Sequence, residues 1–97
     1  MAELPGIKFD KDKLDWSLMP WAQLEETVDV LMFGAARYAP DNWKKVELER
    51  YQKALLRHVV AYSSGEKIDP DSGFSHLSHV ICNCLFALYH ENKLKVE

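Results

Sequence analysis

Three stretches of this chain carry apolar residues at helical spacing, and helix-breaking residues separate them. The stretches cover residues 21–39, 46–63 and 76–91. Apolar positions three and four residues apart indicate amphipathic helices. Pro40 ends the first helix, because proline disfavours α geometry in the residue before it. We therefore expect an all-α protein with three main helices, preceded by an extended arm over residues 1–16.

Local signals also place the ends and faces of these helices. Pro20 suits a first helical position, and Ser72 or Ser75 is the expected cap of the third helix. The second helix has one continuous stripe, made of Tyr51, Ala54, Leu55, His58, Ala61 and Tyr62. The third has two stripes that we expect to face inward, and the apolar one is made of Leu77, Ile81, Cys84 and Leu88. The polar one lies roughly 110° away at 100° per residue, and it contains His76, His79, Asn83 and His90.

The size of the chain bears on its assembly. Its 97 residues suit a single domain covering residues 1–97. A chain of this size buries only roughly 60–65% of its unfolded surface, so a monomer is marginally stable. Three helices also make a poor closed bundle. We expect a homo-oligomer, a dimer or a tetramer, in which the helices of several subunits complete the bundle.

The composition excludes several classes of protein. A net charge of −3 argues against general nucleic-acid binding. No apolar run has the length of a membrane span, and the N-terminus does not resemble a signal peptide. Cys82 and Cys84 lie roughly 200° apart on a helix, so they neither pair nor share a metal ion. A reduced, cytoplasmic protein is expected. The glycine-rich phosphate loops, the H-E-x-x-H zinc motif, the His-Asp dipeptide and the G-x-S-x-G elbow are all absent.

Two pairs of polar residues have the spacing of metal ligands. His76 and His79 lie three residues apart, as do Glu26 and Asp29, so each pair shares one helix face. Facing helices that carry such pairs can hold a metal ion between them. The alternatives are a solvated acidic face and ordinary hydrogen-bonded histidines. His58 lies on the apolar stripe of the second helix, where a structural role and a catalytic role are both open.

Two further segments add candidate residues. The loop before the third helix contains Glu66, Asp69 and Asp71, which are either solvated acids or contacts to a metal ion or water. The end of the first helix combines cations, an amide and aromatic rings in Arg37, Tyr38, Asn42, Trp43, Lys44 and Lys45. Its cations can neutralise phosphates. Its tryptophan is either a loop anchor or a platform for a nucleobase.

Four motifs in the chain resemble a known family. They are L-E-E-x-V-x-V-L-x-F-G-A-x-R-Y-A-P-x-N-W (24–43), R-Y-x-x-A-L-L-R-H (50–58), G-E-x-I-D-P-D-S-G (65–73) and H-L-x-H-x-x-C-N-x-L-F (76–86). Together they resemble the N-terminal domain of the phage-type dATP/dGTP diphosphohydrolases, which are grouped with the MazG-like all-α nucleoside triphosphate pyrophosphohydrolases. The resemblance covers nearly the whole chain.

The resemblance implies an oligomeric enzyme that splits dATP or dGTP into a monophosphate and pyrophosphate, in an infected bacterial cell if the protein is phage-encoded. In the MazG-like group, two E-x-x-[ED] pairs hold Mg²⁺. Glu26 and Asp29 match the first pair, whereas His76 and His79 stand in place of the second. The expected cofactor is therefore Mg²⁺ or Mn²⁺, with Zn²⁺, Fe²⁺ or Ni²⁺ open because imidazole favours them.

The expected site divides into three sets of residues. The catalytic set is Glu26, Asp29 and His58. The metal set is Glu26, Asp29, His76, His79, Glu66 and Asp71. The set that binds the nucleoside triphosphate is Arg37, Tyr38, Asn42, Trp43, Lys44, Arg57 and Asn83. Two alternatives remain, a nucleotide-binding protein without turnover and a phage protein that interacts with a host factor.

Overall fold

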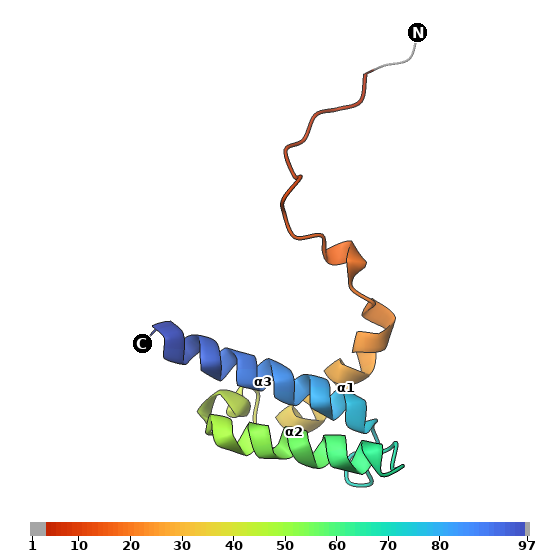
Figure 1. The fold of residues 1–97 in the computed structure, drawn as a ribbon, viewed down its shortest axis with the longest axis vertical. Helices are drawn as coiled ribbons and strands as arrows, with labels where there is room; N and C mark the ends of the chain where they lie inside the picture. Colours follow the sequence, from red (N-terminus) through yellow and green to blue (C-terminus); the bar gives the residue numbers. More distant parts are fainter. Residues whose placement is uncertain (1–3, 97) are drawn as a thin grey trace.

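The computed structural model describes residues 4–96 and confirms the all-α class (Figure 1). Within these residues there is no strand, and Ile68 and Ser75 form one isolated β-bridge. The elements in chain order are η1 (Trp16–Leu18), α1 (Trp21–Arg37), η2 (Asn42–Lys45), α2 (Leu48–Ser63) and α3 (His76–Val96). In this part of the chain, every helix is too short or too polar to span a lipid bilayer.

The observed helix ends differ from the expected ones where the backbone changes direction. α1 ends at Arg37, and the chain reverses through Asp41, whose φ of 61° lies in the left-handed region. The next residues form the short helix η2, so α2 begins at Leu48 instead of residue 46. Of the two expected caps for α3, Ser75 is the one adjacent to it, and its Oγ accepts a hydrogen bond from the backbone N–H of Leu77 at 3.1 Å.

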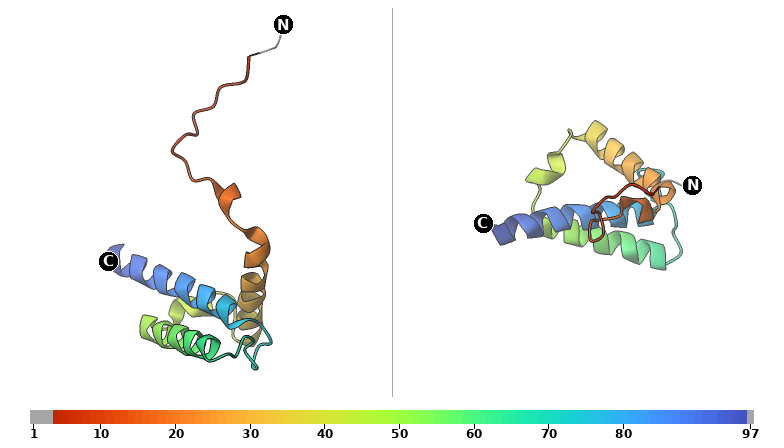
Figure 2. Two further views of the ribbon diagram at one scale, coloured as in Figure 1. Left: turned by 45° about the vertical axis from the view of Figure 1, so that its right-hand side comes forward. Right: turned by 90° about the horizontal axis from the view of Figure 1, so that it is seen from above.

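α3 packs against both other long helices. It lies along α2, and α1 crosses it near its first turns (Figures 1 and 2). The arm before η1 stands away from the helices, and Leu4 and Phe9 are 92% and 89% exposed. This agrees with the expected extended arm, of which residues 1–3 lie outside the described part.

The predicted inward stripes are confirmed on α2 and only in part on α3. On α2, all six residues of the stripe are partly buried, as expected. On α3, the apolar stripe does not face inward, since Leu77 and Leu88 are 46% and 53% exposed. The polar stripe faces inward as expected, with His76 at 3% and Asn83 at 7% exposure. The prediction was wrong for the apolar stripe alone, because the polar contacts of α3 with α2 and α1 leave these leucines on the outside.

One of these contacts joins α1 to the start of α3. Oε1 of Glu26 accepts hydrogen bonds from the backbone N–H of Ser75 and, at 3.2 Å, from Oγ of Ser78. The first N–H groups of a helix have no partner within it, and a carboxylate there also interacts favourably with the helix dipole. Close by, Sγ of Cys82 donates to the carbonyl of Thr27 at 3.5 Å. Glu26 therefore supports the packing of α1 on α3.

We expect the change Glu26→Ala to lower the free energy of unfolding by about 1–2 kcal/mol, because Ser75 and Ser78 lose a charged acceptor. Asp29→Ala on the same helix is the matched control, since Asp29 is exposed, and its effect should stay within about 0.5 kcal/mol. Urea unfolding followed by circular dichroism measures both. Equal effects of the two changes would contradict the role given to Glu26.

The two cysteines should differ in reactivity. Cys82 is 1% exposed, and burial raises the pKa of its thiol to about 12, whereas Cys84 is exposed. Because the thiolate is the reactive form, iodoacetamide should label Cys84 alone in the folded protein and both residues in urea. Mass spectrometry of the digested protein measures this. Equal labelling in the folded state would refute the packing of α3.

Candidate functional site

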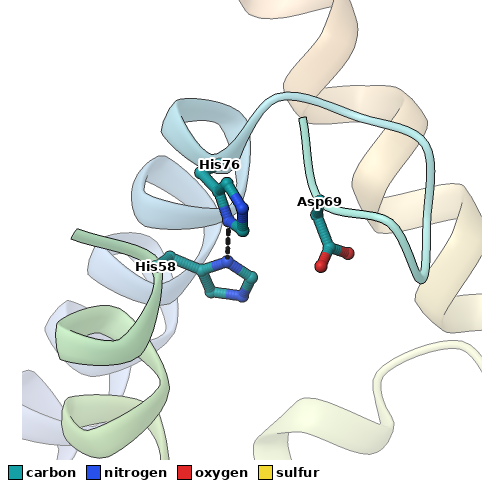
Figure 3. A group of neighbouring side chains, drawn as sticks. All are labelled: His58, Asp69 and His76. Atoms are coloured by element: carbon teal, nitrogen blue, oxygen red, sulfur yellow. Dashed lines mark hydrogen bonds between the residues drawn. The ribbon is translucent and has the colours of Figure 1, made fainter. Parts of the chain in front are cut away.

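Three histidines meet where α2 lies beside the first turns of α3. Nδ1 of His58, from α2, lies 2.8 Å from Nδ1 of His76, the first residue of α3 (Figure 3). The ring of His79 stacks on that of His58, with centroids 4.4 Å apart and an angle of 6° between the planes. The sequence placed His76 and His79 on one face, and α2 adds the third imidazole.

The loop between α2 and α3 brings an acid to this cluster. Asp69 accepts two hydrogen bonds at Oδ2, from the backbone N–H of Ser72 at 3.0 Å and from its hydroxyl at 2.8 Å. Gly73 closes the turn with a φ of 80°, and its N–H donates to the carbonyl of Asp69 at 2.8 Å. The folded loop directs the Asp69 side chain toward the histidines (Figure 3).

Hydrogen bonds fix the tautomers of two rings. Nε2 of His76 lies 2.7 Å from Oε1 of Glu66, and a carboxylate can only accept, so His76 carries a hydrogen at Nε2. Nε2 of His79 lies 2.7 Å from Oγ of Ser72, whose own hydrogen is donated to Asp69. His79 therefore donates as well. If neutral, each ring keeps a lone pair on Nδ1.

The surroundings favour the neutral form of His58 and His79 and the ionised form of Asp69. Burial lowers the pKa of His58, and the charges of His79 and His76 lower it further. Burial also lowers the pKa of His79, against an opposing effect of Asp69. For Asp69, burial alone would raise the pKa, but the hydrogen bonds from Ser72 outweigh it and hold the pKa below its usual value.

His58, Asp69 and His76 form one group that could hold a metal ion. Each offers a ligand atom, and these atoms lie within 4.8 Å of one another. Among the described residues, no other set of three or more histidine, cysteine or acidic side chains meets this criterion. Two nitrogens and one carboxylate oxygen suit Zn²⁺, Mn²⁺ or Fe²⁺ better than Mg²⁺, which takes oxygen ligands.

A large cleft borders this group. Its volume is about 1010 Å³, and it lies among α1, α2, α3 and the segment that joins α1 to α2. His58, Asp69 and His79 line it from the side of the histidine cluster. Three arginines also line it, namely Arg37, Arg50 and Arg57. The arrangement can place a polyanion beside a group of metal-ligating side chains.

The cleft gathers most of the residues expected to bind substrate. The lining residues among them are Arg37, Tyr38, Asn42, Trp43, Arg57 and Asn83. Lys44 does not line the cleft and forms an ion pair of 3.6 Å with Asp41. Nδ2 of Asn83 donates to the carbonyl of His79 at 2.8 Å, which helps to hold the histidine turn in place.

Trp43 packs against α3 and holds η2 in place. Its ring stacks on Phe86 at 4.8 Å and meets the edge of Tyr89 at 4.9 Å, both on α3. Its carbonyl accepts hydrogen bonds from the hydroxyl of Tyr51 at 3.0 Å and from Nε2 of His90 at 3.1 Å. These contacts join η2 to α2 and α3, and the tryptophan still borders the cleft.

The residues expected to bind metal do not form one group. His76 belongs to the three-residue group, whereas His79 lies beside it, stacked on His58 and with its Nε2 3.5 Å from Oδ2 of Asp69. Glu66 contacts the ring of His76. Asp71 forms a bidentate ion pair with Arg37, in which Nη1 lies 2.6 Å from Oδ2 and Nη2 lies 3.4 Å from Oδ1.

Glu26 and Asp29 lie outside the group as well. Sequence reasoning gave Asp69 only as an open possibility and assigned no site role to Ser72 or Arg50. The signal for Asp69 and Ser72 was present in the D-P-D-S-G turn, but nothing local showed which of its acids would turn inward.

Comparisons with known proteins show which family the sequence of this chain matches. The family described as "dATP/dGTP diphosphohydrolase, N-terminal" matches residues 3–96. A similar protein is the "dATP/dGTP diphosphohydrolase" of Salmonella phage PMBT28, which is 31% identical over 86 residues. That match covers 89% of this chain but 30% of the phage protein. No solved structure matches. Because the family match extends over nearly all of it, the chain belongs to the dATP/dGTP diphosphohydrolase N-terminal family.

Proposed function

We propose that this chain is a metal-dependent pyrophosphohydrolase that converts dATP or dGTP into the monophosphate and pyrophosphate. The observation that carries the proposal is the cleft, in which arginines share one lining with His58, His79 and Asp69. The name of the phage relative supports the substrate class. Since the chain spans 30% of that relative, the activity is assigned here on the residues of this chain.

The cationic residues of the cleft are proposed to bind the triphosphate. Guanidinium groups form charge-assisted, bidentate hydrogen bonds with phosphate oxygens. Arg57 is exposed on α2, one residue before His58, and it lines the cleft. Tyr38 is 69% exposed on the same lining and offers a ring face on which a purine can stack.

Hydrolysis needs a group that accepts a proton. A water oxygen forms a bond to the α-phosphorus, the bond from that phosphorus to the oxygen bridging to the β-phosphorus breaks, and pyrophosphate leaves. His79 is proposed to take the proton of the water at Nδ1, because its Nε2 already donates to Ser72 and burial keeps the ring neutral. His58, expected to be catalytic, lies directly against this ring.

A divalent ion is the proposed cofactor. When bound, it would polarise the phosphoryl oxygens of the triphosphate. The group of His58, Asp69 and His76 fits an ion that accepts nitrogen ligands. The expected acid pair fits less well, because Glu26 is engaged with the start of α3 and Asp29 is exposed.

A homo-oligomer is also proposed, because the single chain exposes too much surface. Its accessible area is 8088 Å², whereas a compact protein of 11.2 kDa exposes about 5,700 Å². The extended arm explains part of the excess, and apolar stripes on the helices add to it. The exposed apolar residues of the three helices that do not line the cleft include Trp21, Leu56, Val60, Leu77 and Leu88. A second copy of the chain is the proposed partner for these stripes, since burying apolar surface stabilises association.

We expect the purified chain to release pyrophosphate from dATP or dGTP in the presence of a divalent ion. The change Arg57→Gln should raise KM about tenfold or more, because it removes a charged contact to phosphate. Lys53→Gln is the matched control, since Lys53 is exposed on the same helix, pairs with Glu49 at 3.1 Å and does not line the cleft. A coupled pyrophosphate assay with each deoxynucleotide and with Mg²⁺, Mn²⁺, Co²⁺ or Zn²⁺ measures both.

Absence of pyrophosphate with every nucleotide and every ion would refute the enzymatic function. Calorimetry would then separate the two alternatives, since a nucleotide-binding protein still binds dATP and a host-interaction protein does not.

We expect the wild-type chain to have a mass of at least two subunits by light scattering. The change Leu88→Glu places a charge on the exposed apolar stripe of α3 and should shift the mass toward 11.2 kDa. Asn92→Glu is the control, because Asn92 is an exposed polar residue on the same helix. A wild-type chain that stays monomeric at all concentrations would refute the proposed assembly.

A further inference from the structure

We propose that His58, Asp69 and His76 form a binding site for one transition-metal ion that accepts nitrogen ligands, such as Mn²⁺, Co²⁺ or Zn²⁺. The three side chains come from α2, from the loop and from α3, and they face one another (Figure 3). The site serves as the metal centre of the proposed hydrolase, and to that extent it rests on the proposed function. The binding of the ion, however, is measured without turnover.

The spacing of the ligand atoms is close to that of a metal site. Ions bound at 2.0–2.2 Å keep tetrahedral ligand atoms about 3.4 Å apart. The atoms of this group lie within 4.8 Å of one another, and the two Nδ1 atoms lie 2.8 Å apart. The shorter distance is that of a hydrogen bond. An ion would separate the two nitrogens by roughly half an ångström and draw Asp69 inward, which small side-chain rotations can supply.

The hydrogen bonds around His76 prepare it as a ligand. Its Nε2 donates to Glu66, which leaves Nδ1, the atom that faces His58, as the nitrogen that can bind an ion. A metal-binding histidine almost always donates its other nitrogen to a carboxylate, a carbonyl or water. In the ion-free protein, His58 then carries the hydrogen shared by the two Nδ1 atoms. On binding, that hydrogen moves to Nε2 of His58.

Asp69 is held in a similar way. Both hydrogen bonds from Ser72 end on Oδ2, and among the described residues none ends on Oδ1. The hydrogen bonds from Ser72 hold the carboxylate in place. A second carboxylate oxygen is therefore available for an ion. Because His58 and Asp69 also line the cleft, the ion would border the space in which the triphosphate is proposed to bind.

His90, also on α3, has a purely structural role and serves as a comparison. Nε2 of His90 lies 3.1 Å from the carbonyl of Trp43, a backbone acceptor that is always present. His76 is 3% exposed, yet its buried Nδ1 is paired only with the Nδ1 of a second imidazole. Without an ion, the pair is satisfied only when one ring carries its hydrogen at Nδ1, whereas one ion can accept the Nδ1 lone pairs of both rings. The arrangement therefore suits ion binding, which the fixed backbone acceptor of His90 does not.

Titration of the chelator-treated protein with Co²⁺ tests the site through the visible absorption of the bound ion. We expect one ion per chain, and a loss of affinity of at least about tenfold in His58→Gln and in Asp69→Asn. His90→Gln is the matched histidine control and should bind as the wild type does. Asp29→Asn should also leave binding unchanged, because Asp29 lies outside the group. Circular dichroism establishes that each variant is folded.

Several outcomes would overturn the site. These are no binding of Co²⁺, Mn²⁺ or Zn²⁺ by the wild type, unchanged binding in both His58→Gln and Asp69→Asn, or loss of binding in Asp29→Asn. Release of pyrophosphate with Mg²⁺ by fully active His58→Gln would also overturn it but would leave the proposed function intact. Binding that depends on His58 and Asp69 without any hydrolysis would support the site and refute the function.

Discussion

The part-buried contact between His58 and His76 joins α2 to the start of α3. Its two Nδ1 atoms lie 2.8 Å apart, and Glu66 fixes the second ring from the other side. A buried polar group without a partner costs free energy comparable to a lost hydrogen bond. The rotation of α3 is therefore set by its polar face, and the remaining contacts of the helix follow from that rotation.

Two consequences of this rotation concern function. The first turns of α3 direct His79 and Asn83 toward the cleft, and the start of the helix meets Glu26 of α1. At the same time, Leu77 and Leu88 turn outward. Burial of the polar stripe of α3 therefore brings the site residues together and at the same time exposes the apolar stripe. This relation explains why the proposed metal site and the proposed assembly belong together.

The site also separates this chain from the acid-only arrangement that its resemblance to MazG-like enzymes implies. An acid pair on α1 and a second pair on a facing helix would offer oxygen ligands to Mg²⁺. Here Glu26 instead accepts hydrogen bonds from the start of α3, and Asp69 of the loop lies beside two imidazoles. Imidazole nitrogens in place of carboxylate oxygens suit Mn²⁺ or Zn²⁺ better than Mg²⁺.

The sequence by itself determined the all-α class, the helix boundaries to within a few residues and the shared face of His76 and His79, because these depend on local spacing and on helix-breaking residues. It also indicated, through their types, several of the polar and aromatic residues that line the cleft. Only the tertiary structure decided that the apolar stripe of α3 turns outward and that Asp69, among the loop acids, meets His58. Those outcomes depend on contacts between residues far apart in the chain, where satisfying buried polar groups outweighs the burial of a few leucines.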